Sequence, residues 1–247
     1  MRLLLLNGNT TTAMTDLCAV TARRVARTGT EIVPLTASEG SAVITTRTEN
    51  ALAEGPLLEL LAKHGDGAEG VLVAVSFDTA LAPLREAARV PVVGMTEAAL
   101  HVAALLGGPI GFVGPGLRAR NIYRDVIIQS GLSDRVTGIA TLDLTPEEYL
   151  SPEATCDRIV AAAQTQIAEG AESIVLAGAA MAGMQQAVQE ALPVPVVEGI
   201  AAAVVLLEGL VDLAPRKPET GSYARLPPRD VTQRSHALAG LFRPGPR

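Results

Sequence analysis

The chain has 247 residues, of which 48% are apolar and only 2% aromatic, and its formal net charge is −6. This length suffices for one large α/β domain or two small ones, with an ample core built from aliphatic side chains and Ala. Its arginines are scattered and its aromatic residues are too few for base stacking, which excludes a typical nucleic-acid-binding protein.

The first residues and the most apolar late segment are both unlike export or membrane signals. The apolar run after Arg2 is short and meets Asn7-Gly8-Asn9 at once, which is unlike a signal peptide. The run Ile200–Leu207 is broken by Glu208 and is too short to span a bilayer. We therefore expect a cytoplasmic protein that does not bind membranes.

The first half of the chain alternates apolar runs with segments of helical spacing. The opening run ends in Asn-Gly-Asn, as a buried parallel strand before a turn would, and Gly29 fits a helix stop. The expected strands are Arg2–Leu6, Glu31–Leu35, Gly70–Val75 and Val90–Gly94, and the expected helices are Thr10–Thr28, Glu49–Lys63, Asp78–Ala88 and Glu97–Leu106.

The same alternation restarts in the second half and predicts parallel sheets with right-handed crossovers. The expected strands are Pro109–Gly114, Val136–Leu142, Ser173–Ala177 and Val194–Glu198, and the expected helices are Leu117–Ser130, Pro152–Glu169, Ala182–Ala191 and Ile200–Asp212. We therefore predict an α/β fold of two pseudo-symmetric four-stranded parallel-sheet halves with an inter-lobe cleft. The first lobe would comprise residues 1–97 and 199–247, the second residues 98–198, and Pro215–Arg247 would form an extended arm with a frayed end.

Two segments, Glu69–Leu106 and Ser173–Leu207, are versions of one another. Their Val-Pro-Val-Val strings start 104 residues apart, and the strands before them are offset by 102 residues. Chance similarity of two Ala- and Val-rich segments is the alternative, but the order and lengths of the elements also agree. Ligands bind at the carboxyl ends of parallel strands. The matched strand ends, Ser76 and Gly178, are therefore expected to face one ligand from opposite sides.

Six segments spread over nearly the whole chain carry a family resemblance. They are LLLNGNTT at residues 4–11, AVSFD at 74–78, PVVGMTEAA at 91–99, VLAGAAMAG at 175–183, PVVEGIAAAV at 195–204 and GSYARLPP at 221–228. They resemble the aspartate/glutamate racemase superfamily, most closely its hydantoin racemase branch. The resemblance implies cofactor-independent isomerisation of a small-molecule substrate at a carbon next to a carbonyl, and we expect a homo-oligomer. It also implies two cysteines on opposite faces of the substrate, one thiolate removing the α-proton and the other thiol returning a proton.

The sequence departs from this family at the two cysteine positions, which hold Ser76 and Gly178. A hydroxyl is a far weaker acid than a thiol, and Gly has no side chain. Cys18 and Cys156 lie in other predicted elements, where each is expected to be a small buried residue. Since no zinc spacing or disulfide framework is visible, we expect no metal. The family resemblance implies that no cofactor is needed.

Three carboxylates near the strand ends are candidates for replacing the thiols. Asp78 follows Ser76 by two residues, while Glu97 and Glu198 lie at or just after the two Val-Pro-Val-Val strands. A carboxylate partly buried in an apolar cleft can have a raised pKa and act as a base, although helix capping is the alternative for each. His101 shares a helical face with Glu97, which leaves a proton relay and a structural histidine open. The predicted catalytic residues are Ser76, Asp78, Glu97 and Glu198.

The predicted substrate-binding residues lie in the same strand-end turns. Amides and hydroxyls in the turn after the first strand can bind a substrate amide or carboxylate, with ordinary turn chemistry as the alternative. The equivalent turn in the second half, Gly114-Pro115-Gly116, is expected to offer fewer donors and more room. The predicted binding residues are Asn7, Asn9, Thr10, Phe77, Thr96, Gly178, Ala179 and Ala180.

These observations predict a racemase or epimerase that acts at the acidic carbon next to a carbonyl of a cyclic amide, such as a hydantoin or a cyclic dipeptide, through non-thiol acid/base groups. Two alternatives remain open. One is a lyase that decarboxylates malonate-type acids. The other is a non-catalytic binding protein on the same cleft, which the pair Ser76 and Gly178 favours.

Overall fold

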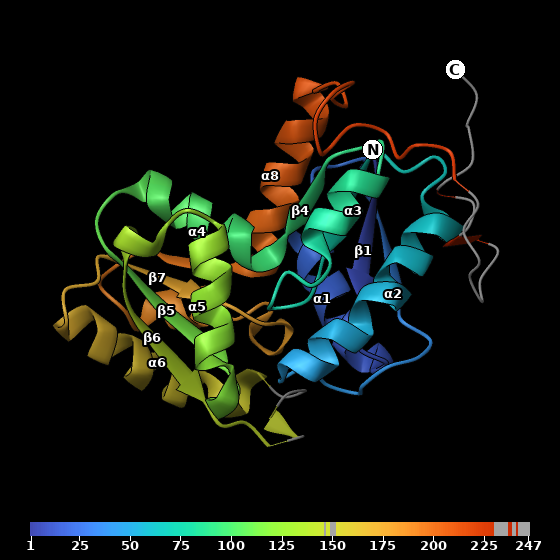
Figure 1. The fold of residues 1–247 in the computed structure, drawn as a ribbon. Coiled ribbons are helices and arrows are strands. Elements are labelled where there is room, and N and C mark those ends of the chain that lie inside the picture. The colour runs from blue at the N-terminus through green and yellow to red at the C-terminus, as the bar shows by residue number, and fades with distance from the viewer. Residues whose placement is uncertain (146, 149–151, 230–236, 239–240, 242–247) are drawn as a thin grey trace.

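The chain folds into two four-stranded sheets that are parallel throughout. The computed structural model describes residues 1–145, 147–148, 152–229, 237–238 and 241. The strand order is β2-β1-β3-β4 in one sheet and β6-β5-β7-β8 in the other, so the two halves share one topology. Helices flank both sheets, which lie side by side (Figure 1). The predicted α/β fold of two four-stranded parallel halves is confirmed.

The first half follows the predicted order of elements closely. Four leucines of β1 are fully buried, as a central parallel strand covered on both faces requires. The elements are β1 (Arg2–Asn7), α1 (Thr12–Val25), β2 (Glu31–Thr36), α2 (Arg47–His64), β3 (Gly70–Val73), α3 (Leu81–Ala87), β4 (Val92–Gly94) and α4 (Met95–Leu106).

The second half repeats this order and adds short 3-10 turns. One of these turns, Ala179–Met181, comes directly after Gly178 and is labelled η4. The elements are β5 (Ile110–Pro115), α5 (Arg120–Gln129), β6 (Val136–Leu142), α6 (Pro152–Ala168), β7 (Ser173–Leu176), α7 (Gln185–Glu190), β8 (Val196–Glu198) and α8 (Gly199–Leu213).

The two halves interlock through α4 and α8. Helix α4 follows the last strand of the first sheet but packs against β7 and β8, whereas α8 follows the last strand of the second sheet and packs against β3 and β4. The two helices also pack against each other, and their first residues, Met95 and Gly199, touch. The division into residues 1–97 with 199–247 and residues 98–198 depends on this exchange and stays a prediction.

The turn after β3 differs from the prediction. Helix α3 begins at Leu81 and not at Asp78, because Asp78 and Ala80 have φ angles of 49° and 57°, which no right-handed helix accommodates. The chain therefore makes a tight turn here before the helix starts. This turn frees the Asp78 carboxylate from capping its own helix.

The chain after α8 runs over the first half without helix or strand through residues 214–229. The Lys217 ammonium donates to the carbonyl oxygens of Arg85 and Glu86 at 2.6 and 2.8 Å, at the end of α3, which fastens this segment. Most of the rest of the predicted arm, with its frayed end, lies outside the described residues.

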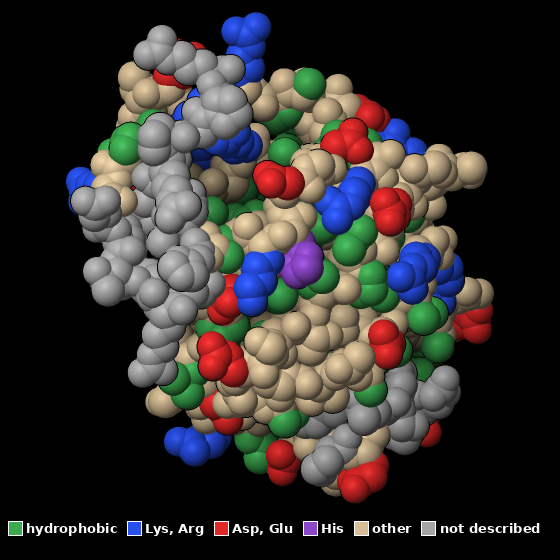
Figure 2. Space-filling view, turned by 90° about the vertical axis from the view of Figure 1, so that its right-hand side faces the viewer, with side chains coloured by type: hydrophobic (Ala, Val, Ile, Leu, Met, Phe, Trp, Pro, Cys, Tyr) green, Lys and Arg blue, Asp and Glu red, His purple; other side chains and the backbone are tan. Residues whose placement is uncertain are grey.

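The molecular surface shown in Figure 2 carries acidic and basic side chains interspersed with one another. Among the described helices, none combines the length and the apolar character needed to cross a bilayer.

Two glycines of α8 test the contact between the helix starts. A Cβ atom at Gly199 would lie 2.9 Å from Met95 Cε and 3.0 Å from the Met95 carbonyl oxygen, whereas one at Gly209 would meet nothing within 4 Å. We expect Gly199→Ala to lower the free energy of unfolding by about 1–3 kcal/mol, through overpacking. Gly209→Ala, the matched control, should raise it by about 0.5–1 kcal/mol. Urea unfolding of both variants measures the difference, and equal effects would contradict the close helix contact.

Candidate active site

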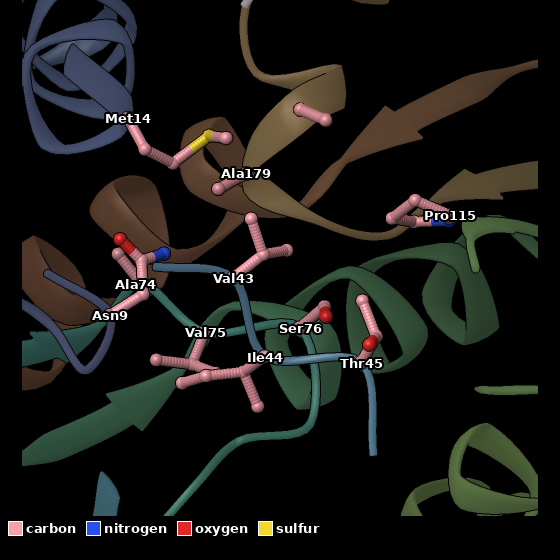
Figure 3. Close-up of a pocket in the computed structure, with 11 residues that line it drawn as sticks. Asn9, Met14, Val43, Ile44, Thr45, Ala74, Val75, Ser76, Pro115 and Ala179 are labelled. Carbon is pink, nitrogen blue, oxygen red and sulfur yellow. The ribbon is translucent and has the colours of Figure 1, made fainter. Parts of the chain in front are cut away.

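A cavity lies between the two halves at the carboxyl ends of their strands (Figure 3). Its empty volume is about 400 Å³, which includes space open to solvent. This is where a ligand site of parallel α/β sheets is expected. The lining residues are Asn9, Met14, Val43, Ile44, Thr45, Ala74, Val75 and Ser76 from the first half, and Pro115, Ala179 and Ala180 from the second.

Ser76 and Gly178, the matched ends of the repeat, lie opposite each other at this cavity. A Cβ atom built on Gly178 would lie 3.7 Å from the Cβ atom of Ser76. The Thr96 hydroxyl donates to the Ser76 carbonyl oxygen at 2.8 Å, which holds this strand end against the start of α4. The Ser76 side chain therefore faces a position that has none.

The Pro115 ring fills the space that a side chain at residue 178 would need. Its Cδ and Cγ atoms lie 2.7 and 2.9 Å from the Cβ position of Gly178. Gly178 also has a φ of 108°, which side-chain-bearing residues rarely adopt. The expectation of more room at Gly114-Pro115-Gly116 is therefore wrong at this edge, because the proline ring takes the space that the missing side chain leaves.

Aromatic packing connects the two edges of the cavity. The Tyr123 hydroxyl donates to the Pro115 carbonyl oxygen at 3.1 Å. The Tyr123 ring packs edge-on against Phe77, the neighbour of Ser76, and also against Phe112, with ring centroids 5.2 and 4.9 Å apart. Half of the six Phe and Tyr residues of the chain thus gather behind the cavity, where they brace both strand ends.

Asn9 presents a hydrogen-bond donor to the cavity. Its Oδ1 atom accepts from Asn7 Nδ2 and from the Thr11 backbone amide, both at 2.9 Å. With the oxygen engaged, the amide nitrogen is turned toward the other lining residues (Figure 3). Asn7 is buried and supports Asn9 from behind. Such a donor suits the carbonyl oxygen of an amide ligand.

Three further predicted binding residues, like Asn7, support the cavity without lining it. Thr96 holds the Ser76 carbonyl, and Phe77 belongs to the aromatic cluster. The Thr10 backbone amide donates to the Ser41 carbonyl oxygen at 3.0 Å, which fastens the turn after β1 to the next connection.

The connection between β2 and α2, residues 37–46, covers the cavity and was not predicted to do so. Val43, Ile44 and Thr45 all line it. The Thr45 amide and hydroxyl donate to the Glu49 carboxylate at 2.8 and 3.1 Å, and the next residue forms a capping box with Glu49. The one sequence signal for this cover is the length of the connection, which exceeds that of an ordinary βα loop.

The carboxylate of Glu97 is engaged away from the cavity. It forms two hydrogen bonds with the Arg85 guanidinium, one of them 3.0 Å long. The His101 ring nitrogen lies 2.8 Å from the Glu97 carbonyl oxygen and not from the carboxylate, so the two side chains are not arranged as a relay. Glu97 on α4 is therefore ion-paired with Arg85 on α3.

Asp78 and Glu198 cap the two helices that meet between the halves. Asp78 accepts from the second and third backbone amides of α4 at 3.0 and 2.7 Å. Glu198 accepts from the second and third backbone amides of α8 at 2.8 and 3.0 Å. Burial raises the pKa of each carboxyl to about 7, against the effect of these N–H groups. Neither carboxylate lines the cavity, so their catalytic roles stay predictions.

The two cysteines lie outside the cavity. Cys18 is fully buried on α1, where burial and the nearby Glu198 raise its pKa, and Cys156 on α6 is partly buried. Among the described residues, no three His, Cys, Asp or Glu side chains converge as possible metal ligands.

The sequence matches the Asp/Glu/Hydantoin racemase family over residues 3–207, most of the chain. The chain belongs to this family. It is 31% identical to a hydantoin racemase of Paenarthrobacter aurescens over 229 residues, which cover 91% of this chain and 97% of the relative.

Two solved structures share its fold. The allantoin racemase from Klebsiella pneumoniae has a TM-score of 0.89 and 29% identity, covering 96% of this chain and 98% of its own. The allantoin racemase from Pseudomonas fluorescens has a TM-score of 0.90 and 32% identity, covering 94% of this chain and all of its own.

The Pro115 ring and Gly178 form a matched pair that a double-mutant cycle can test. Gly178→Ala should lower the free energy of unfolding by about 1–3 kcal/mol from backbone strain, with a further loss from the clash with the ring. Gly131→Ala is the strain-only control, since Gly131 has a φ of 72° and open space around it. Adding Pro115→Ala should recover the clash component alone. Strict additivity of the two substitutions would show that the ring does not occupy the site.

The two capping carboxyls predict a stability that falls with rising pH. Their folded pKa of about 7 lies above the unfolded value of about 4, so the folded state holds extra protons between these values. The free energy of unfolding should therefore fall by up to about 1.4 kcal/mol per pH unit for each group from pH 4 to 7. Urea unfolding of the wild type and of Asp78→Asn across this pH range isolates the contribution of Asp78. The part of the pH dependence that comes from Asp78 should be absent in the variant.

Glu208→Gln serves as the control for that titration. Although burial acts against it, hydrogen bonds from Thr30 and Arg27 lower the pKa of this buried carboxyl. Its stabilising contribution is lost only as the pH falls below the ordinary glutamate range. The difference between wild type and Glu208→Gln should thus be flat from pH 5 to 8, where the Asp78 difference changes.

Proposed function

We propose that this protein is a cofactor-independent racemase or epimerase that acts at the acidic carbon next to a carbonyl of a cyclic amide, such as a hydantoin or a cyclic dipeptide. Family membership over most of the chain carries the proposal. The named relatives support the substrate class, because they are hydantoin and allantoin racemases that align almost end to end with this chain. Allantoin is itself a substituted hydantoin, so these names describe one ring.

The lining residues suggest how such a ring would be held. The Asn9 amide would donate to a ring carbonyl, and the Ser76 hydroxyl would meet the hydrogen on the neighbouring carbon. When that C–H bond breaks, the proton passes through the hydroxyl to water, and the electron pair moves to the carbonyl oxygen as an enolate. A hydrogen-bond donor at this oxygen stabilises the developing charge.

The opposite face would work differently. Gly178 offers no side chain, and the Pro115 ring covers its place. The returning proton would come from a water molecule beside the Pro115 ring, and the new C–H bond on that face inverts the centre. The hydroxide left behind takes up the proton released on the Ser76 side. Because a hydroxyl and water are weaker acid/base groups than two thiols, such an enzyme would be slow and would favour rings whose α-proton is already acidic.

A specific observation also favours a second candidate, a ligand-binding protein without turnover. None of the lining residues among the described part of the chain is titratable near neutral pH. A cavity of this kind can bind an amide ring through Asn9 and its apolar walls without abstracting a proton. Both candidates predict that the protein binds the ligand, but only the racemase exchanges the ligand's α-proton.

Proton exchange in heavy water separates the two candidates. We expect 5-substituted hydantoins to lose their C5 proton signal in NMR faster with protein than without, while optical activity decays in parallel. Ser76→Ala should slow exchange by about 100-fold or more with little change in KM, as loss of an acid/base group does. Ser130→Ala, remote from the cavity, should not. Hydantoin-dependent thermal stabilisation without any exchange would overturn the racemase proposal in favour of the binding protein.

A further inference from the structure

Asp78 and Glu198 hold equivalent places in the two halves, although they are not equivalent in sequence. The repeat offset of 104 places Glu198 at the position of Gly94, and the offset of 102 places Ala180 at the position of Asp78. In the first half, the Asp78 carboxyl occupies the space that a side chain on Gly94 would take. Each half therefore places one carboxylate at the start of the helix that follows its last strand. In the first half it comes from the turn after β3, and in the second from the end of β8.

The amides that receive these carboxylates correspond residue by residue. Asp78 binds the backbone amides of Thr96 and Glu97, and the offset of 104 turns these into Ile200 and Ala201, the amides that Glu198 binds. Both helix N-termini carry partial positive charge, which favours an anionic acceptor there. The arrangement is therefore a symmetric feature of the fold, rebuilt on each side with a different residue.

Each carboxylate also ties one edge of the cavity to its helix. Asp78 lies two residues after Ser76, and Thr96, whose amide it binds, donates its hydroxyl to the Ser76 carbonyl oxygen. Glu198 contacts the backbone amide of Gly183, in the turn that begins at Gly178. The strand-end turns and the helix starts are joined through these two groups.

We infer that Asp78 and Glu198 are a pair of positioning residues, one per half, that set the placement of Ser76 and of the Gly178 edge. The inference rests on the proposed function only for its effect on turnover. Both carboxyls would act by holding the backbone in place and would not touch the substrate.

The charged surroundings of the two groups differ. Arg85 and Glu97 face Asp78, and they are paired with each other, whereas Arg24 and Cys18 face Glu198 from α1. Since burial raises the pKa of both carboxyls to about 7, each edge of the cavity should respond to pH near neutrality.

Backbone NMR titration tests the inference without any substrate. In the wild type, the amide signals of Ser76 and Gly178 should shift with midpoints near pH 7. Asp78→Asn should abolish the Ser76 titration and leave that of Gly178, and Glu198→Gln should do the reverse. Glu208→Gln, a buried carboxyl of α8 away from the cavity, should change neither. A Ser76 signal that does not titrate, or that titrates unchanged in Asp78→Asn, would overturn the inference.

Moving the carboxylate to its alternative partner gives a sharper test. Asp78→Ala should abolish the Ser76 titration, and Asp78→Ala combined with Gly94→Glu should restore it, because the pair then reproduces the arrangement of the second half. If Asp78→Ala does not fold, Asp78→Gly serves as the parent for the same addition, because the φ of 49° at residue 78 suits glycine. A double variant that folds without restored titration would contradict the equivalence of the two arrangements.

Proton exchange in heavy water adds the functional readout. If the wild type exchanges the hydantoin proton, Asp78→Asn and Glu198→Gln should lower kcat at least tenfold, leave KM within about threefold, and each remove a pH inflection near 7. Wild-type rates in both variants would overturn the positioning role while leaving the racemase proposal intact. Absence of exchange in the wild type would overturn only that proposal, since the NMR titration stands independently.

Discussion

The starts of α4 and α8 meet between the two sheets, and two buried carboxylates hold them in place. Met95 and Gly199 are in contact there, which only a glycine permits at so short a distance. Asp78 and Glu198 satisfy amides that a helix start leaves without partners. Each helix then packs against strands of the opposite sheet, so the relative placement of the two halves, and with it the cavity, depends on this junction.

The cavity keeps the shape of a two-sided site although one side carries no reactive side chain. At Gly178 the backbone has a conformation that favours glycine, and the Pro115 ring fills the space that a side chain would take. Tyr123 holds that ring through its carbonyl oxygen and reaches Phe77 on the other edge. Tyr123 thus contacts both edges of the cavity. Because protein interiors are closely packed, a change in side-chain volume at one edge should shift the other through these rings.

The polar groups that remain suit a neutral amide better than a charged acid. Asn9 is oriented by its neighbours to donate, Ser76 and Thr45 supply hydroxyls, and the remaining walls are apolar. The titratable carboxyls lie one layer behind, bound to backbone amides. In this family member the buried carboxyls bind the backbone around the cavity, and the side chains that line the cavity are uncharged.

The sequence by itself determined the alternation of strands and helices, the repeat and the expectation that Ser76 faces Gly178. Hydrophobic periodicity and the order of elements along the chain are read locally, and parallel topology then places the strand ends at one edge. It also singled out Asp78 and Glu198. Only the tertiary structure decided what they do, since a carboxylate cannot reveal from its own neighbours which distant helix start it will cap. The same holds for Pro115 and for the cover formed by residues 37–46. Which space a ring or a loop fills depends on side chains far away in the chain, and no local pattern records that.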